Sequence, residues 1–426
     1  MRSYDEIMEQ LHGRPRYSKK KDLDRITNLM AALGNVQKNL HFVHVAGTNG
    51  KGSVSALTAS ALQQAGFRVG LFTSPYLKEF EERIRVNGQL IPKEDLCRLA
   101  EQVFAVQQRL EDSGGDAANE FEITTAIGML WFYEQGCDYV VLEVGLGGRL
   151  DATNVIDPPA CCCVTSIGLD HILQLGDTIE QVAGEKAGII KPGSKVVTPY
   201  NQDPIALRVL EERCKQVGAE LVQTCTPSNV ALKPEETAYR YGDLSVSIPL
   251  AGGHQVANST IALELCRCLG LEDEIILSGF AKVFWPGRLQ VLSKSPWMVL
   301  DCAHNPPGVA ALEDALDTLY PDKPLTVVMA MMQDKDYAPC VHAIAKRAAH
   351  FVATTLDMPR ALSSEDLART AAEICQDTSA RADVLQAIHL AQEKTSEDGL
   401  ILICGSVYLA GEILRIADTP SYSDKI

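Results

Sequence analysis

The amino-acid sequence predicts an α/β protein built from two domains. Strand-like and helix-like segments alternate along most of the 426 residues. The strand-like segments are short, continuous apolar runs that end in glycine, such as DYVVLEVG (138–145) and ACCCVTSIG (160–168), and such runs are typical of parallel strands covered on both faces. Pro286 and Gly287 then interrupt the pattern. Since a chain of this length usually forms two or three domains, we expect a larger domain over 1–286 and a smaller one over 287–426.

The first domain contains the longer alternating series. HFVHVAG (41–47) is expected to be a buried strand, and KGSVSALTASALQQAG (51–66) a helix with Gly66 just past its end. Amphipathic helices are expected over 93–110 and 120–136, and a more polar, β-like stretch over 228–250. The remaining expected elements are strands over 67–74, 138–145, 160–168, 195–200 and 219–224, and helices over 179–190, after Tyr200 and over 254–270.

The second domain repeats the pattern over a shorter length. We expect strands at WMVLDCAHNP (297–306), LTVVMAMM (325–332), HFVATT (350–355) and the start of GLILICGSVYLAGEIL (399–414), with helices between and after them. One of these helices should end near Leu319, and two should lie between the last two strands. The last six or so residues are expected to form a frayed tail.

Composition excludes several classes of protein. Lys and Arg total 39 against 55 Asp and Glu, a net charge of −16, whereas nucleic acids and anionic membranes favour basic partners. No apolar run approaches a membrane span, and the N-terminus lacks a signal-peptide core. The thirteen cysteines lack zinc-ligand spacing and are expected to be small buried apolar side chains. We therefore expect a cytoplasmic protein.

The stretch GTNGKGSV (47–54) predicts a phosphate-binding turn between a strand and a helix. Backbone N–H groups at a helix N-terminus favour an anion, and three glycines allow close backbone approach. Lys51 would neutralise phosphate charge, and the Ser53 hydroxyl would ligate Mg²⁺. The spacing differs from the usual Walker motif, so the alternative is a flexible turn with Lys51 in solvent.

Other polar residues have two interpretations each when taken alone. Glu143 follows a buried strand and would either bind Mg²⁺ or cap a turn. Asp301 would either bond a ribose hydroxyl or cap the next helix, and Asp151 would accept hydrogen bonds from a ligand or form an Asx turn. His171 and Lys186, taken alone, are more typical of structural roles.

The combination of motifs resolves these interpretations. HVAGTNGKGSV (44–54) resembles the ATP loop of the Mur ligase superfamily, and within it the folylpolyglutamate synthase and dihydrofolate synthase branch. Further stretches resemble that family's signatures in the family's order: TSPYL (73–77), ERIRVNG (82–88), EVGLGGRLDATNV (143–155), GLDH (168–171), GEKAGIIKPG (184–193), WPGR (285–288) and LDCAHNP (300–306). The resemblance implies a Mur-ligase-like ATPase domain with a mostly parallel sheet, and a smaller Rossmann-like C-terminal domain that closes over the nucleotide.

The resemblance also implies roles for individual residues. The catalytic residues it implies are Lys51, Lys186 and His304, with Lys186 carbamylated by CO₂ to support the second of two Mg²⁺ sites. The ATP-binding residues it implies are Gly50, Lys51, Gly52, Ser53, Asn258, Arg288 and Asp301, and the metal ligands are Ser53, Ser74, Glu143 and His171. Cys302 departs from the family, which usually has a smaller residue there; it would be harmless if it points inward and would alter closure if it points at the nucleotide.

The implied acceptor substrate is a pterin-bearing acid. The pterin pocket would be lined by Phe121, Glu122, Ile123, Thr124, Leu150, Asp151 and Ala152. Its carboxylate would attack the γ-phosphate of ATP, and the amino group of L-glutamate would displace phosphate from the resulting acyl phosphate. The form RLDATN (149–154) resembles bifunctional bacterial enzymes that accept dihydropteroate as well as reduced folates; the alternative is a monofunctional folylpolyglutamate synthase.

Two rival functions were weighed against this interpretation. A cell-wall Mur ligase would carry an additional N-terminal domain, and few residues precede the loop strand here. A nucleotide-dependent switch would need the phosphate loop, but not WPGR, LDCAHNP and the lysine motif together. We expect a ligase of small molecules, and a monomer would suffice because the site lies between two domains of one chain.

Overall fold

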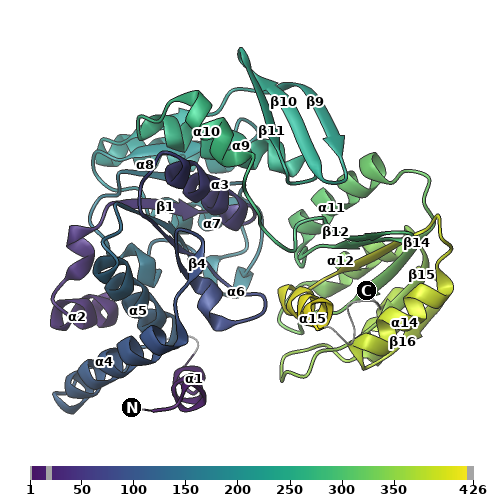
Figure 1. The fold of residues 1–426 in the computed structure, drawn as a ribbon, viewed down its shortest axis with the longest axis horizontal. Coiled ribbons are helices and arrows are strands. Elements are labelled where there is room, and N and C mark those ends of the chain that lie inside the picture. The colour runs from purple at the N-terminus through teal and green to yellow at the C-terminus, as the bar shows by residue number, and fades with distance from the viewer. Residues whose placement is uncertain (1, 16–21, 420–426) are drawn as a thin grey trace.

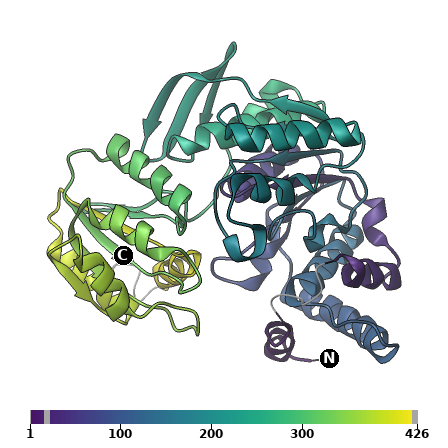
Figure 2. The same ribbon diagram turned by 180° about the vertical axis from the view of Figure 1, so that it is seen from behind.

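The computed structural model describes residues 2–15 and 22–419 and contains two α/β lobes with a cleft between them. Figures 1 and 2 show the N-terminal lobe, coloured purple to teal, beside the C-terminal lobe, coloured green to yellow. The expected frayed tail lies outside the described residues. No helix in the described ranges is long and apolar enough to cross a membrane.

An eight-stranded sheet organises the N-terminal lobe, in the order β4-β3-β2-β5-β1-β6-β7-β8. Six strands pair in parallel, as the continuous apolar runs predict, and β3 and β4 form an antiparallel edge. The strands are β1 (Phe42–Ala46), β2 (Val69–Phe72), β3 (Ile84–Val86), β4 (Gln89–Leu90), β5 (Tyr139–Glu143), β6 (Cys161–Val164), β7 (Lys195–Thr198) and β8 (Glu220–Gln223).

Helices cover both faces of this sheet. One face, which includes Phe42 and Cys162, packs against α1 (Tyr4–His12), α2 (Asp24–Ala32), α4 (Lys93–Asp112), α5 (Glu120–Glu134), α7 (Ile179–Ala187) and α8 (Pro204–Val217). The other face, which includes Val43 and Cys163, packs against α3 (Lys51–Gln64), α9 (His254–Cys268) and α10 (Asp273–Phe280). Short helices lie at η1 (Val36–Asn39), η2 (Phe80–Arg83), η3 (Ala152–Val155) and α6 (Ile172–Leu175).

One helix differs from its expected pattern. The segment 120–136 was expected to be amphipathic, but α5 is buried continuously from Glu122 to Phe132. It lies between the sheet and helices α2 and α4, so neighbours cover every side of it. Helix α4, on the outside, keeps the expected exposed stripe.

The polar β-like stretch forms a separate three-stranded antiparallel sheet of β9 (Ser228–Lys233), β10 (Glu236–Tyr241) and β11 (Leu244–Ile248). Its inward side chains Tyr239, Tyr241, Val246 and Ile248 extend the core beneath α9. In Figure 1 this sheet rises above the junction between the lobes.

The C-terminal lobe contains a six-stranded sheet in the order β12-β13-β17-β14-β15-β16, parallel except for β12. Its strands are β12 (Gln290–Lys294), β13 (Trp297–Leu300), β14 (Leu325–Met329), β15 (Ala348–Ala353), β16 (Thr378–Ala380) and β17 (Leu400–Cys404). Helices α11 (Pro306–Leu319), α12 (Tyr337–Ala345) and α13 (Ser364–Ala372) pack on one face, and α14 (Val384–Lys394) and α15 (Val407–Asp418) on the other. The expected strands and helices of this lobe are confirmed; β12 and β16 were not expected.

All thirteen cysteines are unpaired, and eleven of them are buried. Cys161, Cys162 and Cys163 lie within β6, where desolvation raises the pKa of each thiol. No metal-holding group of three or more His, Cys, Asp or Glu side chains exists in the part of the chain that the structure describes. The prediction that the cysteines serve as small core side chains is confirmed for these eleven, whereas Cys225 is exposed and Cys268 is partly exposed.

Candidate active site

The glycine-rich turn GTNGKGSV lies between β1 and α3, at the carboxyl edge of the central strand. Gly50 is the N-cap of α3 with φ of 85°, a left-handed conformation that favours glycine. A Cβ at Gly47 would lie 1.7 Å from Thr165 Oγ1, and one at Gly50 would lie 2.1 Å from Asn258 Oδ1. The turn is therefore compact and closely packed, and the flexible-turn alternative does not describe it.

Lys51 lies over this turn and does not extend into solvent. Its ammonium donates to the backbone carbonyls of Gly47 and Thr48 at 3.2 and 3.1 Å. Lys186, on α7, is buried and donates to the same Gly47 carbonyl at 2.8 Å. Burial, together with the charge of Lys51, lowers the pKa of Lys186 to about 7. Two ammonium groups thus converge beneath the N-terminus of α3.

Helix α9 supplies polar side chains next to the turn. Asn258, which packs against Gly50, donates through Nδ2 to Gln255 Oε1 at 3.0 Å. Gln255 Nε2 in turn lies 3.4 Å from the buried Ser53 hydroxyl. The structure therefore brings the predicted residues Gly50, Ser53 and Asn258 together at one end of α3.

Glu143 is the last residue of β5, the strand that pairs directly with β1, and its carboxylate is buried. Its Oε2 accepts the Ser74 backbone N–H at 3.1 Å. Burial raises the pKa of Glu143 although Lys51 and Arg288 favour its charged form. A buried carboxylate is costly unless a cation meets it, and hydroxyl and carboxylate oxygens are donors that suit Mg²⁺.

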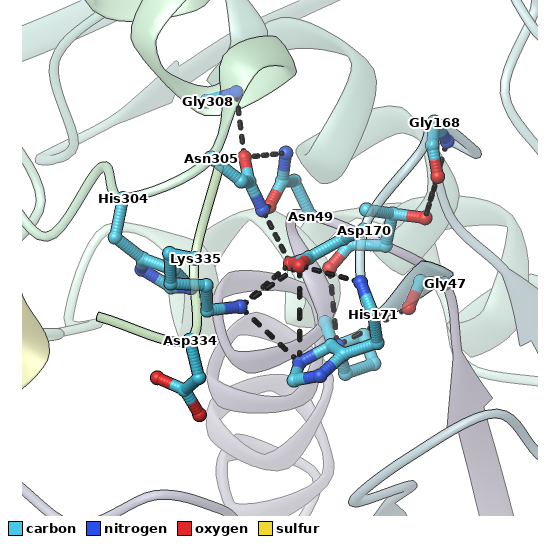
Figure 3. Close-up of polar contacts among 12 residues, drawn as sticks. Gly47, Asn49, Gly168, Asp170, His171, His304, Asn305, Gly308, Asp334 and Lys335 are labelled. Atoms are coloured by element: carbon cyan, nitrogen blue, oxygen red, sulfur yellow. Dashed lines mark hydrogen bonds and ion pairs between the residues drawn. The ribbon is translucent and has the colours of Figure 1, made fainter. Parts of the chain in front are cut away.

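His171 belongs to a polar network that joins the two lobes, drawn in Figure 3. Lys335, from the C-terminal lobe, donates to Asp170 at 2.8 and 3.1 Å and approaches His171 Nε2 at 3.3 Å. Asn305 Nδ2 also donates to Asp170, at 2.8 Å, and the Asn305 side chain pairs with Asn49 of the glycine-rich turn at 3.1 Å. In this arrangement the Nε2 atom of His171 accepts from Lys335.

Charge accounts for the protonation states in this network. Burial, together with the charge of nearby Lys335, lowers the pKa of His171 to about 4 even though Asp170 favours its protonation. Burial disfavours ionised Asp170, but His171 and the Lys335 ammonium hold the pKa of this carboxyl well below its usual range. Near neutral pH, therefore, Asp170 and Lys335 form an ion pair beside a neutral imidazole.

The junction between the lobes positions Asp301, Arg288 and His304. Asp301 does not cap the following helix, because Asn305 caps α11; its oxygens instead accept the N–H groups of Leu289 and Ala303 at 2.9 and 2.8 Å. Arg288 donates to its neighbour's carbonyl, that of Gly287. His304 Nδ1 lies 2.8 Å from the backbone carbonyl oxygen of Cys302. Because a carbonyl only accepts, Nδ1 is the donor, which leaves His304 Nε2 as an acceptor.

Cys302 points inward, and its side chain interacts with that of Arg288. It is buried in the core of the C-terminal lobe, and its Sγ would lie 2.7 Å from a Cβ built at Gly287. The extra bulk relative to a smaller residue is therefore packed against the glycine of the junction.

A second part of the site is a cleft of about 960 Å³ between the lobes. Ligand clefts of this size commonly hold small molecules. Five of the predicted substrate residues line it: Phe121, Glu122, Leu150, Asp151 and Ala152. Ile123 and Thr124 do not line this cleft, because both are buried within α5, and their role in the pterin pocket stays a prediction. Glu122 also pairs with Arg25 at 3.1 Å and is thus held within the protein.

Of the two interpretations of Asp151, the structure shows the Asx turn, and the role in ligand binding stays a prediction. It forms the Asx turn, accepting Thr153 N–H at 3.0 Å, and it also lines the cleft. It accepts Leu146 N–H at 2.8 Å and lies 2.5 Å from the Thr153 hydroxyl, which is 2.9 Å from His44 Nε2 in β1. Burial raises the pKa of Asp151 despite these hydrogen bonds.

Comparison with known proteins decides the family. Residues 45–266 match the Mur ligase middle domain, and residues 287–407 match the Mur ligase glutamate ligase domain. A dihydrofolate synthase/folylpolyglutamate synthase of Bacillus subtilis is 37% identical over 97% of this chain and 99% of its own length. The chain belongs to the folylpolyglutamate synthase/dihydrofolate synthase family. Members of this family are Mur-type ATP-dependent ligases, so this chain is a ligase that joins glutamate to folates.

Further relatives and solved structures agree. A folylpolyglutamate synthase of Lacticaseibacillus casei is 35% identical over 96% of this chain and 98% of its own length. A Mycobacterium tuberculosis folylpolyglutamate synthase complexed with ADP has a TM-score of 0.90 at 29% identity, and E. coli FolC in complex with DHPP and ADP has a TM-score of 0.86 at 28% identity. Each comparison covers 98% of both chains.

Several residues of this ligase's site were not predicted. Asn49, Asp170 and Asn305 lie inside the quoted motifs, adjacent to predicted residues, so their positions carried a signal that was not used. Lys335 had no such signal, because it pairs with a residue 165 positions away. A nucleotide switch needs only one lobe of this site, whereas the matches to this ligase family span both lobes.

Proposed function

We propose that this ligase is bifunctional and adds L-glutamate to dihydropteroate and to reduced folates. The observation that carries this proposal is the interlobe cleft, whose wall includes Asp151 and Phe121 as well as Ser74 and His304 from the phosphate side. The bifunctional name of the Bacillus subtilis relative supports it, as does the E. coli structure with DHPP. The monofunctional alternative is favoured by the name of the Lacticaseibacillus casei relative.

In the proposed site, ATP places its phosphates at the N-terminus of α3. The backbone N–H groups there and the ammonium of Lys51 favour the anion. Asn258 borders the same turn and contacts the nucleotide, while Arg288 and Asp301 approach it from the junction between the lobes. Gly50 and Gly52 allow side chains to pack closely on the turn, since a Cβ at Gly52 would lie 3.0 Å from the ring of Trp285.

Two Mg²⁺ sites are part of the proposal, and the donor atoms fit this ion. Ser53, Ser74 and Glu143 offer hydroxyl and carboxylate oxygens near the turn, and Mg²⁺ usually takes one or two carboxylates plus phosphate oxygens. His171 joins as a ligand only when Lys335 withdraws from its Nε2. When bound, the metal neutralises phosphate charge as it develops.

The reaction forms one C–N bond at the expense of one phosphoanhydride bond. An oxygen of the acceptor carboxylate attacks the γ-phosphorus, which forms an acyl phosphate and releases ADP. The glutamate amino group then attacks the acyl carbon, which forms the amide and releases phosphate and a proton. Residues from both lobes line the cleft, and closure of the lobes around the bound substrates would exclude water that hydrolyses the acyl phosphate.

We propose that Lys186 is carbamylated in the working enzyme. The modification requires a neutral amine, and burial lowers the pKa of Lys186 to about 7. The carbamate would replace one of two converging ammonium groups with an anion that supports the second Mg²⁺ site. We expect a ¹³C carbamate signal when ¹³C-bicarbonate is added to the wild-type protein and none for Lys186→Arg; an identical signal in both proteins would refute the assignment.

The organisation of the chain completes the proposal. We place the domain boundary at residues 286 and 287, where the second matched domain begins. We further propose a monomer, because both lobes of the site come from one chain. A cytoplasmic location is supported by thirteen unpaired cysteines, since reducing compartments keep thiols free.

The decisive test is glutamate-dependent ADP release by the purified protein, run in parallel with dihydropteroate and tetrahydrofolate. We expect turnover with both acids. Turnover with tetrahydrofolate alone would support the monofunctional alternative and remove the pterin role given to Asp151. Hydrolysis of ATP that does not depend on glutamate would contradict the ligase assignment.

A further inference from the structure

Arg83 of the ERIRVNG motif lies on the wall of the interlobe cleft. Arg83 ends the short helix η2, just before β3. Its guanidinium carbon lies 5.2 Å from the ring centre of Tyr76 and 5.4 Å from that of Phe80. The two rings are themselves packed edge to face, 5.8 Å apart. Arg83 is thus held in place by aromatic contacts, which leaves its N–H groups for other partners.

No carboxylate lies within ion-pair distance of those N–H groups in the described part of the chain, although the charges of Glu120 and Glu143 favour the protonated form from farther away. The lysine and the other arginines of the cleft wall are each paired with a carboxylate, at distances between 2.6 and 3.1 Å: Arg25 with Glu122, Arg149 with Glu185, Lys335 with Asp170 and Arg360 with Asp334. Arg83 forms no comparable ion pair within residues 2–15 and 22–419, and its Nε is buried without a hydrogen-bond partner.

An unpaired guanidinium is expensive in such a setting. Desolvation lowers the pKa of Arg83, yet an arginine stays protonated at neutral pH, so the charge remains. An enclosed charge without a partner destabilises the folded protein. A bound anion removes that cost, and a forked guanidinium suits a carboxylate or phosphate group in particular.

The position of Arg83 selects between these two anions. Arg83 lines the same cleft as Ser74 and Phe121, and it contacts Tyr76 of the TSPYL stretch that also contains Ser74. The phosphate groups already have the N-terminus of α3, Lys51 and Arg288. In the proposed reaction, the carboxylate of the acid substrate must lie between the phosphate site and the pterin pocket.

We propose that Arg83 binds the carboxylate of the acid substrate and holds one of its oxygens while the other faces the γ-phosphate. This inference rests on the proposed function. It assigns Arg83 as a substrate-binding residue that distinguishes an acid from a neutral analogue. The same chemistry could recognise a carboxylate of glutamate, so the experiment separates the two sources.

The test is equilibrium binding, without ATP or glutamate, of dihydropteroate and of its carboxamide analogue, which carries no charge. We expect wild-type protein to prefer the acid by roughly 10- to 100-fold, the range for a hydrogen bond to a charged group. Arg83→Gln should bind the acid as weakly as the amide and leave amide binding unchanged. Arg98→Gln, which removes an exposed arginine of α4, is the matched control and should keep the preference.

Several outcomes would overturn the inference. An Arg83→Gln protein that still prefers the acid would exclude this role. A raised KM for glutamate with an unchanged acid preference would assign Arg83 to the amino-acid substrate and also contradict it. If Arg83→Gln fails to fold, Arg83→Lys is used: it keeps the charge without the fork, and we expect weaker acid binding with unchanged amide binding. Failure of wild-type protein to bind either pterin would instead contradict the proposed function.

Discussion

Lys51 and Lys186 both donate to the carbonyl of Gly47, at 3.2 and 2.8 Å. Two ammonium groups on one oxygen repel each other, and the lowered pKa of Lys186 relieves this repulsion by favouring its neutral form. Phosphates at the N-terminus of α3 would relieve it in the opposite way, by supplying negative charge. The ionisation of one buried lysine and the occupancy of the phosphate site are therefore coupled.

Lys51→Ala should abolish ligase activity while leaving the fold intact. The lysine lies over its own turn, and its removal takes away the charged donor proposed to bind the phosphates; losses of about 10²- to 10³-fold or more are typical for one such donor. Glutamate-dependent ADP release measures the effect, and circular dichroism checks the fold. Lys195→Ala, an exposed lysine at the start of β7, is the control. Retained turnover in Lys51→Ala would refute the role.

His44 predicts a pH dependence of stability. Burial in the central strand, with a smaller effect of Lys191, lowers its pKa to about 3, whereas an unfolded histidine titrates near 6.5. Between these values the unfolded state binds more protons, so stability should fall as the pH drops below about 6.5. One such group contributes at most about 1.4 kcal/mol per pH unit.

Urea unfolding at pH 7.0 and 5.5 tests this dependence. The raised pKa values of Glu143 and Asp151 act in the opposite direction, because those folded carboxyls bind protons more readily than unfolded ones. Comparison with His44→Gln therefore isolates the histidine: the variant should lose less stability on acidification than the wild type. Equal losses in the two proteins would contradict the assignment.

At the scale of elements, α3 and α10 meet through a glycine. A Cβ at Gly279 would lie 2.5 Å from Ala61 Cα, and the Ser60 hydroxyl bonds the Gly279 carbonyl at 2.6 Å. Backbone atoms cannot move aside as a flexible side chain does, so the helix that carries Lys51 is positioned by this contact. The contact ties the phosphate turn to a helix outside the site.

Gly279→Ala should destabilise the protein by about 1–3 kcal/mol, the usual cost of overpacking a core contact. We expect the urea midpoint of unfolding to fall. The KM for the acid substrate should change little, because the cleft lies away from the contact between Gly279 and Ala61. Gly184→Ala is the matched control. Gly184 lies in a different helix, α7, and a Cβ built there meets no atom within 4 Å. Equal urea midpoints for the two variants would contradict this prediction and show that α10 shifts to accommodate the added methyl group.

Elements were predictable where the signal is local. Apolar runs predicted the parallel strands around β1, and Gly66 marks the end of α3 with φ of 90°. Helix α5 was judged amphipathic because periodicity does not reveal that neighbouring helices cover its outer side. The same limit explains why Ile123 and Thr124 do not line the cleft. A sequence motif identifies the segment, but the direction in which each of its side chains points depends on packing.

The site was predictable to the same extent. The resemblance located Ser53, Ser74 and Glu143, which the structure finds at adjacent strand and helix ends. The pairing of Asp170 with Lys335 was not predictable, because it joins residues of different lobes, and no local spacing encodes such a contact. Polar residues that meet across the cleft are therefore the part of the site that requires coordinates.

At the scale of the whole molecule, the lobes are joined by a close backbone contact as well as by polar groups. A Cβ at Gly411 of α15 would lie 1.9 Å from the carbonyl oxygen of Leu77, and Lys78 pairs with Asp418 at 2.6 Å. Leu77 belongs to the TSPYL stretch, which also contains Ser74. The approach of α15 thus sets the distance between the two lobes beside the cleft.

Gly411→Ala should hold the lobes apart. We expect ligase activity to fall by at least about 10-fold, because positioning of reactants across the cleft is sensitive to shifts near 1 Å. X-ray scattering should show a larger radius of gyration, with secondary structure unchanged. The control is again Gly184→Ala. Unchanged activity and scattering would show that this contact does not control lobe spacing.

The distribution of the cysteines makes thiol labelling a probe of how each lobe opens. Among thirteen thiols, Cys225 is exposed, Cys268 is partly covered, and eleven are buried. In native protein a maleimide should therefore modify Cys225 first, while the buried thiols react only as their surroundings open. Of these, Cys302, Cys340, Cys375 and Cys404 lie in the C-terminal lobe and the other seven in the N-terminal lobe. Peptide-resolved labelling over time would thus record, from one unmutated sample, whether the two lobes open together or one after the other.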